Sequence, residues 1–321
     1  KLSVWLSGLV SFERAAEVME QVGRIGTSRG SVWQQSSLWG SKFQAEEEKV
    51  QKMAAEVELR NGVVPGEEKI ARRMGVSMDG GMIHIRGEGW KEAKIGCIFE
   101  VEQGIVVDEQ THEEIEAGRA RHNTYVAHLG EPEAFGQKVW AEAKRRRWTS
   151  AADTQVVGDG AVWIWNLVAE HFYDSQQIVD WYHGKEHLAH AAELLHGEGT
   201  PATQRWLKEE ETSLFQGHAD EIAHRIRQRA QGKSCRDELL REAGYFEHNQ
   251  HRMDYLEMRI QGWVTGSGMV ESAAKQFKAR LAGPGMHWSR AGAERLLPIR
   301  SAILSGRFHQ VWHSAYNSPP L

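Results

Sequence analysis

Cysteine is nearly absent from this sequence, because only Cys97 and Cys235 occur in 321 residues, far apart along the chain. Two distant cysteines exclude a disulfide scaffold and any cysteine-based zinc finger. No run of eighteen apolar residues occurs, which argues against a membrane-spanning helix. The apolar start, KLSVWLSGLVSF, is broken by Ser and Gly, so it does not have the pattern of a signal peptide. It also lacks an initiator Met, so we expect the back part of a longer chain. The scarcity of cysteine leads us to expect a cytoplasmic protein.

Excess positive charge is also lacking overall, since the formal net charge is −5. The distribution is uneven, however. Residues 260–310 carry seven basic side chains against two acidic ones, and KRRRW at 144–148 is a second basic cluster. Such clusters are typical either of a solvated face or of a surface that binds phosphates. With 40% hydrophobic and 26% charged residues, the chain has the composition of an ordinary globular protein.

The first part of the chain has a helical pattern. Apolar residues recur at helical spacing from Phe12 to Val22, and a turn with glycines then precedes a short segment through Val32 and Trp33. This outline fits a helix-turn-helix, although any helical hairpin looks similar. Residues 44–73 are predicted to form a solvated helix and a linker through Pro65-Gly66. We therefore predict a helical region over 1–73.

After residue 73 the apolar period changes from 3.6 to 2. Residues 76–86 and 94–101 are predicted strands joined by a turn at Gly87 and Gly89, and 124–130 a third strand. A helix begins at Pro132, and strands at 154–159 and 176–181 flank a helix over 161–172. Three antiparallel strands followed by parallel strands are typical of the ribonuclease-H-like α/β fold. We predict this domain over 74–190 and 260–321, with an all-helical insertion at 191–259.

Three carboxylates stand at positions that this topology would bring together: Asp79 on the first strand, Asp159 at the end of the fourth, and Glu271 in the first turn of the last helix. Converged carboxylates need a cation, and their hard oxygen atoms suit two Mg²⁺ or Mn²⁺ ions that clamp a phosphodiester. Each residue also has a simpler interpretation. Asp79 fits a turn, Asp159 a helix cap, and Glu271 a partner of the helix dipole.

Four segments carry a resemblance to a known family: VSMDGGMIHIRGEGWKEAKIG, VVGDGAVWIWNL, IVDWYHGKEHL and VTGSGMVESAAKQFKARLAGPGMHWSRAGAERLLPIR. They resemble the DDE-type transposases of bacterial insertion sequences of the ISKra type, over roughly residues 60 to 312. The resemblance implies that Asp79, Asp159 and Glu271 form the catalytic triad and bind the metal ions. It also implies transposon ends and target DNA as substrates, a homo-oligomer on DNA, and a location at the bacterial nucleoid.

The stretch DWYHGKEHLAHAAELL contains two overlapping patterns. Asp180-x-x-His183 matches a signature that follows the second Asp in related transposases, which implies a supporting role for both residues. His183-x-x-Glu186-His187 instead matches a zinc-protease pattern, which leaves a zinc hydrolase as an alternative. An ordinary amphipathic helix is a third interpretation. A non-catalytic DNA-binding or repressor relative is a further alternative for the whole chain.

The basic residues supply the predicted DNA contacts. Lys275 and Lys278 lie one and two turns beyond Glu271, where they would meet phosphates beside the scissile bond, although a surface Glu–Lys ladder is equally consistent. Trp288 would stack on an unpaired base, with His287 and Arg290 beside it. The full set of predicted DNA-binding residues is Lys275, Lys278, Arg280, His287, Trp288, Arg290, Arg145, Arg146 and Arg147.

Overall fold

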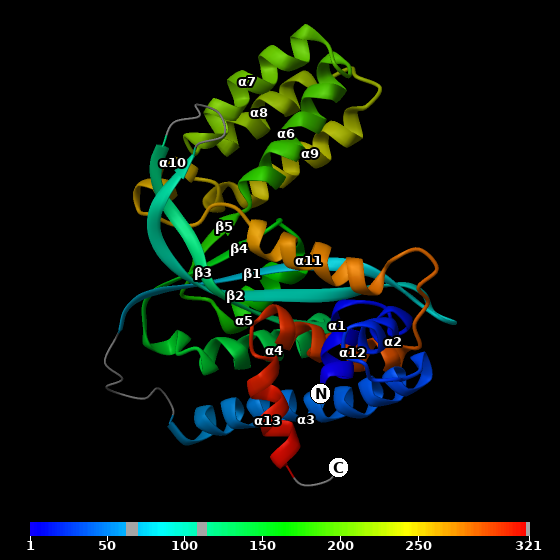
Figure 1. Cartoon of the computed structure of the whole chain (residues 1–321). Coiled ribbons are helices and arrows are strands. Elements are labelled where there is room, and N and C mark those ends of the chain that lie inside the picture. Colours follow the sequence, from blue (N-terminus) through cyan, green and yellow to red (C-terminus); the bar gives the residue numbers. More distant parts are fainter. Residues whose placement is uncertain (62–69, 108–113, 319–321) are drawn as a thin grey trace. The chain divides into compact units, whose positions relative to one another are not determined.

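The computed structural model of the chain describes residues 1–61, 70–107 and 114–318 (Figure 1). Within these residues the strands form one mixed five-stranded sheet of order β3-β2-β1-β4-β5. The strands are β1 (Ile70–Ile85), β2 (Gly89–Val107), β3 (Glu114–Leu129), β4 (Ala151–Gly158) and β5 (Gln176–Val179). β4 and β5 are parallel, with Gln155 opposite Gln176 and Gly158 opposite Val179. The predicted mixed α/β class and the neighbourhood of the first and fourth strands are thus confirmed.

The helices differ from the predicted order near both ends of the chain. The helix predicted to be the last, which begins at Gly268, is followed by two more over 290–304 and 308–317. Residues 29–61 form a single helix, where the sequence suggested a short helix and then a solvated one. The predicted linker at Pro65-Gly66 lies outside the described residues. The helices are α1 (Leu2–Leu9), α2 (Phe12–Gln21), α3 (Arg29–Asn61), α4 (Pro132–Arg145), α5 (Val162–His171), α6 (Trp181–His196), α7 (Pro201–Phe215), α8 (Ala219–Arg229), α9 (Arg236–Asn249), α10 (Tyr255–Ile260), α11 (Gly268–Leu281), α12 (Arg290–Leu304) and α13 (Phe308–Asn317).

The chain divides into two compact units. Unit 1 comprises residues 1–99, 122–152 and 268–321, and unit 2 comprises residues 100–121 and 153–267. The N-terminal helices belong to unit 1. Arg280 Nε donates to the Ser7 carbonyl (2.7 Å), and Arg300 Nη1 donates to the Gly8 carbonyl (3.0 Å). The first helices are therefore hydrogen-bonded to the last ones within the same unit.

In unit 1 the strands β1 and β2 are covered on both faces by helices (Figure 1). A methyl group added at Gly96 would meet Val139 and Phe135 of α4 within 3.3 Å. On the other face, a methyl group at Gly81 would lie 3.1 Å from Lys278 Cε on α11. This coverage explains why β2 is buried continuously from Ala93 to Phe99 instead of alternating.

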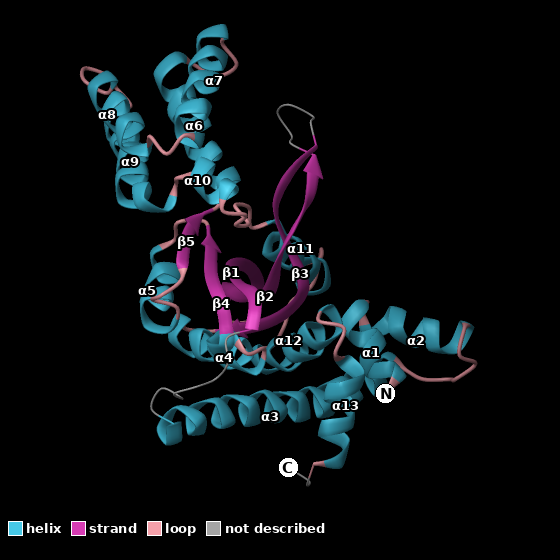
Figure 2. Cartoon of the chain, turned by 90° about the vertical axis from the view of Figure 1, so that its left-hand side faces the viewer, coloured by secondary structure: helices cyan, strands magenta, loops and turns pink. Residues whose placement is uncertain are grey.

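In unit 2, α6 to α10 pack around one apolar cluster (Figure 2). Its members include Leu188 of α6, Trp206 of α7, Ile222 of α8 and Phe246 of α9, each less than 5% exposed. Helices of this length depend on such a shared apolar face for their stability. Among the described residues, no helix is long and apolar enough to cross a membrane.

Gly40 of α3 is predicted to be intolerant of a side chain. A Cβ atom there would lie 2.4 Å from the Arg295 carbonyl oxygen of α12, so Gly40→Ala must push two packed helices apart. We expect a loss of about 1–3 kcal/mol in the free energy of unfolding, measured by urea denaturation. Gly30→Ala is the control in the same helix, because its Cβ would meet only Ser28 Oγ at 3.6 Å. Equal stability of the two variants would contradict this packing.

Candidate functional site

In unit 2, two aspartates follow directly after two paired strands. Because Gly158 of β4 lies opposite Val179 of β5, Asp159 and Asp180 leave the sheet side by side, and Asp180 N donates to the Gly158 carbonyl (2.8 Å). Asp159 Oδ1 accepts from Ala161 N (2.8 Å), which fixes the turn into α5. The carboxyl ends of parallel strands are where open α/β sheets commonly place their functional groups.

The Asp180 carboxylate is fully buried and caps α6. Its Oδ1 accepts from His183 N (3.0 Å), and its Oδ2 accepts a short hydrogen bond from Ser267 N. Burial by itself would raise the pKa of Asp180, but the bonds from His183 and Ser267 outweigh it and lower the pKa below its ordinary value. Asp180 thus remains ionised and holds the segment before α11 against the start of α6.

His183 stands beside this carboxylate. Its Nδ1 lies 3.8 Å from Asp180 Oδ1, within ion-pair range. The interaction with Asp180 raises the pKa of His183 to about 9, against the opposing effect of partial burial, and Asp159 and Glu186 raise it further. The structure therefore contains a local Asp180–His183 pair, with the imidazole in its cationic form at neutral pH.

This pair predicts a pH dependence of stability. Since folding raises the His183 pKa from 6.5 to about 9, the stabilisation is fully present below pH 6.5 and is lost as the pH rises through about 9. We expect the wild type to lose more unfolding free energy than His183→Gln between these two pH values. Denaturant titrations across this range measure the difference, and parallel curves for the two proteins would refute the interaction.

His187, the second histidine of the H-x-x-E-H pattern, and the following His190 have a different partner. His187 Nδ1 and His190 Nδ1 lie 2.7 and 2.9 Å from the two oxygens of Glu242 on α9. The rings of His187 and Tyr245 stack with centroids 3.6 Å apart. Because His183 faces Asp180 and His187 faces Glu242, the two imidazoles are directed to different carboxylates. These contacts do not favour a shared zinc ion.

Tyr245 of α9 is a residue that sequence reasoning missed. Its hydroxyl donates to the Asp159 backbone carbonyl (3.1 Å). Its ring also packs closely on Gly160, because a Cβ atom at Gly160 would lie 2.7 Å from the Tyr245 ring. Burial, with the nearby Asp159 and Asp180 carboxylates, raises the pKa of Tyr245, so the hydroxyl stays protonated and donates. Tyr245 and Asp159 are 86 residues apart in the sequence, so no local sequence pattern could predict this contact.

In unit 1, Asp79 lies within β1 and not in a turn, so the turn interpretation is wrong. Its Oδ1 accepts from Gly80 N (2.6 Å), and the side chain is half-buried. The two following glycines allow side chains to approach the strand closely. A Cβ at Gly80 would lie 2.3 Å from Glu92 Oε1, and Lys278 covers Gly81.

Glu271 lies in the first turn of α11, a helix whose apolar side is buried. Its side chain is 33% exposed and lies 4.0 Å from Lys275 Nζ, so the Glu–Lys pair of the simpler interpretation is present. Lys275 itself is 80% exposed and available to a ligand. Asp79 and Glu271 belong to unit 1 and Asp159 to unit 2, and the convergence of all three remains a prediction.

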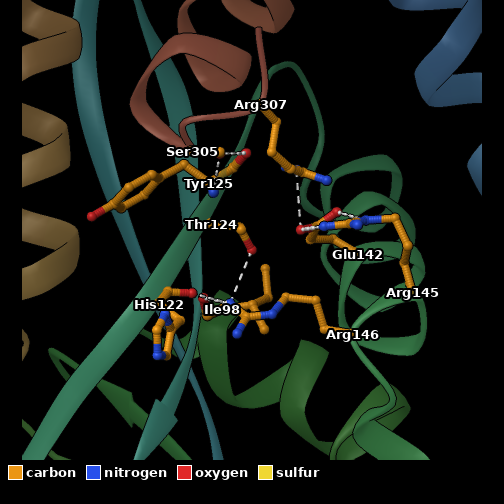
Figure 3. Close-up of polar contacts among 9 residues, drawn as sticks. All are labelled: Ile98, His122, Thr124, Tyr125, Glu142, Arg145, Arg146, Ser305 and Arg307. Atoms are coloured by element: carbon orange, nitrogen blue, oxygen red, sulfur yellow. Dashed lines mark hydrogen bonds and ion pairs between the residues drawn. The ribbon is translucent and has the colours of Figure 1, made fainter. Parts of the chain in front are cut away.

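The basic cluster at 145–147 is largely used within unit 1 (Figure 3). Arg145 forms a bidentate pair with Glu142 (2.7 and 2.8 Å), and Arg307 binds the same carboxylate (3.1 Å). Arg146 donates to the carbonyls of Ile98 (2.8 Å) and His122. Arg147 has a left-handed backbone (φ 64°) that ends α4. The contacts of Arg146 hold α4 against β2 and β3, and the role of the cluster in DNA binding stays a prediction.

The predicted DNA-binding residues at 280–290 also have protein partners. Arg280 is buried. Arg290 binds Glu88, with Nε–Oε1 at 3.0 Å, and His287 Nδ1 lies 2.8 Å from His84 Nδ1. Trp288 Nε1 donates to the Leu281 carbonyl (2.8 Å), and Trp288 N to the His84 carbonyl (3.1 Å). The segment 284–289 is thereby fixed beside the end of β1.

Comparison with models of known protein families gives no match, and a search of curated proteins finds none either. Fold class alone does not define chemistry, so any function has to be argued from the residues of the site. The candidate functional residues are the aspartates after β4 and β5 in unit 2, and, in unit 1, Asp79 of β1 with Glu271 and Lys275 of α11.

Proposed function

We propose that the chain is a DDE-type DNA transposase with a ribonuclease-H-like catalytic domain. The observation that carries the proposal is the position of three acidic residues in the fold. Asp79 lies within β1, Asp159 follows β4, and the strand order makes β1 and β4 neighbours. Glu271 lies on α11, the helix that packs on β1. These placements support the proposal, because the family resemblance implies that the three carboxylates act together.

The donor set fits Mg²⁺ or Mn²⁺, because all three proposed ligands offer carboxylate oxygens and none offers sulfur or nitrogen. Asp79, Asp159 and Glu271 would hold the ions. Bound there, two such ions supply activation of the attacking water or 3′-hydroxyl and stabilisation of the departing oxygen.

The chain's own side chains would position the DNA. Lys275, 80% exposed and one turn beyond Glu271, would bind a phosphate beside the scissile bond, and Lys278 another. Asp180 and His183 would act as positioning residues, because they fix the strand ends from which Asp159 projects. Two DNA ends must be processed together, so we propose a homo-oligomer on DNA as the active form.

The test is an in-vitro cleavage and joining assay on DNA that carries both ends of the mobile element encoding the chain. We expect hydrolytic nicking and transfer of the freed 3′-hydroxyl to target DNA in Mg²⁺ or Mn²⁺, and neither product in EDTA. Binding of the ends without cleavage in either metal would contradict the proposal and favour the non-catalytic relative. Zinc-dependent peptide hydrolysis would instead favour the hydrolase.

A further inference from the structure

Unit 1 contains a cavity of about 500 Å³ that is distinct from the carboxylates discussed above. The N-terminal turns of α3 and α12, the residues around the start of α2, and the segment 285–289 line it. Its lining combines three aromatic rings with four basic side chains and no carboxylate. These residues are Phe12, Trp33, Trp288, Arg29, Arg86, Arg280 and His287. The volume is within the usual range of small-ligand sites.

Arg280 is a buried cation in the wall of this cavity. Arg280 is 2% exposed, and its Nε donates to the Ser7 carbonyl (2.7 Å). Its Nη2 has no hydrogen-bond partner within the described part of the chain. The guanidinium carbon lies 5.1 Å from the ring centroids of both Phe12 and Trp288. Burial and the nearby Arg300 lower the pKa of Arg280 to about 10, so it stays charged at neutral pH. An unsatisfied buried guanidinium N–H favours an anionic ligand.

Two exposed arginines add to this charge. Arg29 begins α3, and Arg86 follows β1. Neither side chain forms an ion pair with any of the residues that the structure describes, in contrast to Arg145 and Arg290. Guanidinium groups beside a helix N-terminus are suited to bind a phosphate.

Trp33 provides a free aromatic surface beside these cations. It is 50% exposed, although it lines the cavity. Trp288 is different, because its indole N–H is bonded to Leu281 and its ring packs edge-on against Phe12 at 5.9 Å. Trp33 is therefore the ring on which a planar ligand can stack, while Trp288 and Phe12 form the wall that holds Arg280.

We propose that this cavity binds one unpaired nucleotide of a DNA strand, with its base on Trp33 and its phosphate between Arg29, Arg86 and Arg280. A base with a phosphate is the ligand whose chemistry matches both parts of the lining. The inference rests on the proposed function only for the source of the strand, which would be an unpaired end of the mobile element.

The test compares binding of a labelled duplex with a short single-stranded overhang and of the same duplex with blunt ends. We expect wild type to prefer the overhang by about tenfold, as stacking of one base predicts. Trp33→Ala should lose this preference and Trp33→Phe should keep it. Arg86→Ala should remove about one phosphate contact, so the slope of log binding constant against log salt concentration should become shallower by about 1. Arg14→Ala is the matched control, since Arg14 lies on α2 outside the cavity and pairs with Glu17.

Equal overhang preference in wild type and in Trp33→Ala, both with unchanged thermal unfolding, would overturn the inference. Competition by inorganic phosphate as strong as that by a mononucleotide would also overturn it, because the base would then contribute nothing. A mononucleotide that binds as tightly as the overhang would refute the assignment to a DNA strand. If wild type shows no overhang preference but still cleaves DNA in Mg²⁺, the inference about this cavity fails while the proposed function stands.

Discussion

Glu271→Gln should reduce Mg²⁺-dependent DNA cleavage and joining by more than about a hundredfold. Changes to groups that merely orient a metal ligand cost up to roughly that factor, and Glu271 is the proposed ligand itself. The amide keeps the size of the side chain but removes the negative charge that the proposed ions require. Initial rates of nicking and of strand transfer, measured at saturating DNA, give the effect on the chemical step.

Glu294→Gln is the matched control for this substitution. Glu294 lies on α12, its side chain is 36% exposed, and it lies 3.5 Å from Arg290 one turn away, as Glu271 lies one turn from Lys275. Loss of a surface Glu–basic pair therefore affects both variants alike. If Glu271→Gln retained activity equal to that of Glu294→Gln, Glu271 would not be a metal ligand.

Asp180→Ala should destabilise the chain by about 3 kcal/mol, the largest stability effect that we expect from a single substitution in unit 2. The change leaves the buried Ser267 N–H and the His183 N–H without their acceptor, and it removes the charge beside the His183 imidazole. Urea denaturation of the purified variant at pH 7 gives the difference in the free energy of unfolding.

Asp254→Ala separates the burial effect from ordinary helix capping. Asp254 caps α10 in the same unit and accepts from Glu257 N (3.3 Å), but its side chain is exposed. A cap of this kind contributes about 1 kcal/mol. Equal losses for Asp180→Ala and Asp254→Ala would show that the buried interactions of Asp180 contribute nothing beyond the cap.

Local sequence patterns predicted most of the elements. The strand around Asp79 and the turn at Gly87 and Gly89 follow from alternation and from glycines, both of which have positive φ angles. Strand lengths were underestimated, because β1 begins at Ile70, before the alternating part. The sequence also split α3, although Gly40 is accommodated inside it by close packing on α12.

Partners that are distant in the sequence could not be predicted. The arginines of the 145–147 cluster looked like a surface for phosphates, but Arg146 donates to the carbonyls of Ile98 and His122, which lie 48 and 24 residues earlier in the sequence. Similarly, Glu242 and Tyr245 meet α6 and the end of β4 only because α9 packs beside them. Charge and spacing describe what a side chain can do, while its partner depends on which elements the fold brings together.

The central claim is that Asp79, Asp159 and Glu271 jointly hold divalent metal ions, and Mn²⁺ binding tests it most directly. Electron paramagnetic resonance counts the ions bound by wild type and by a variant with Asp79→Asn, Asp159→Asn and Glu271→Gln, each in complex with end DNA. We predict about two ions that wild type binds and the triple variant does not. The same number of bound ions in both proteins would contradict the account.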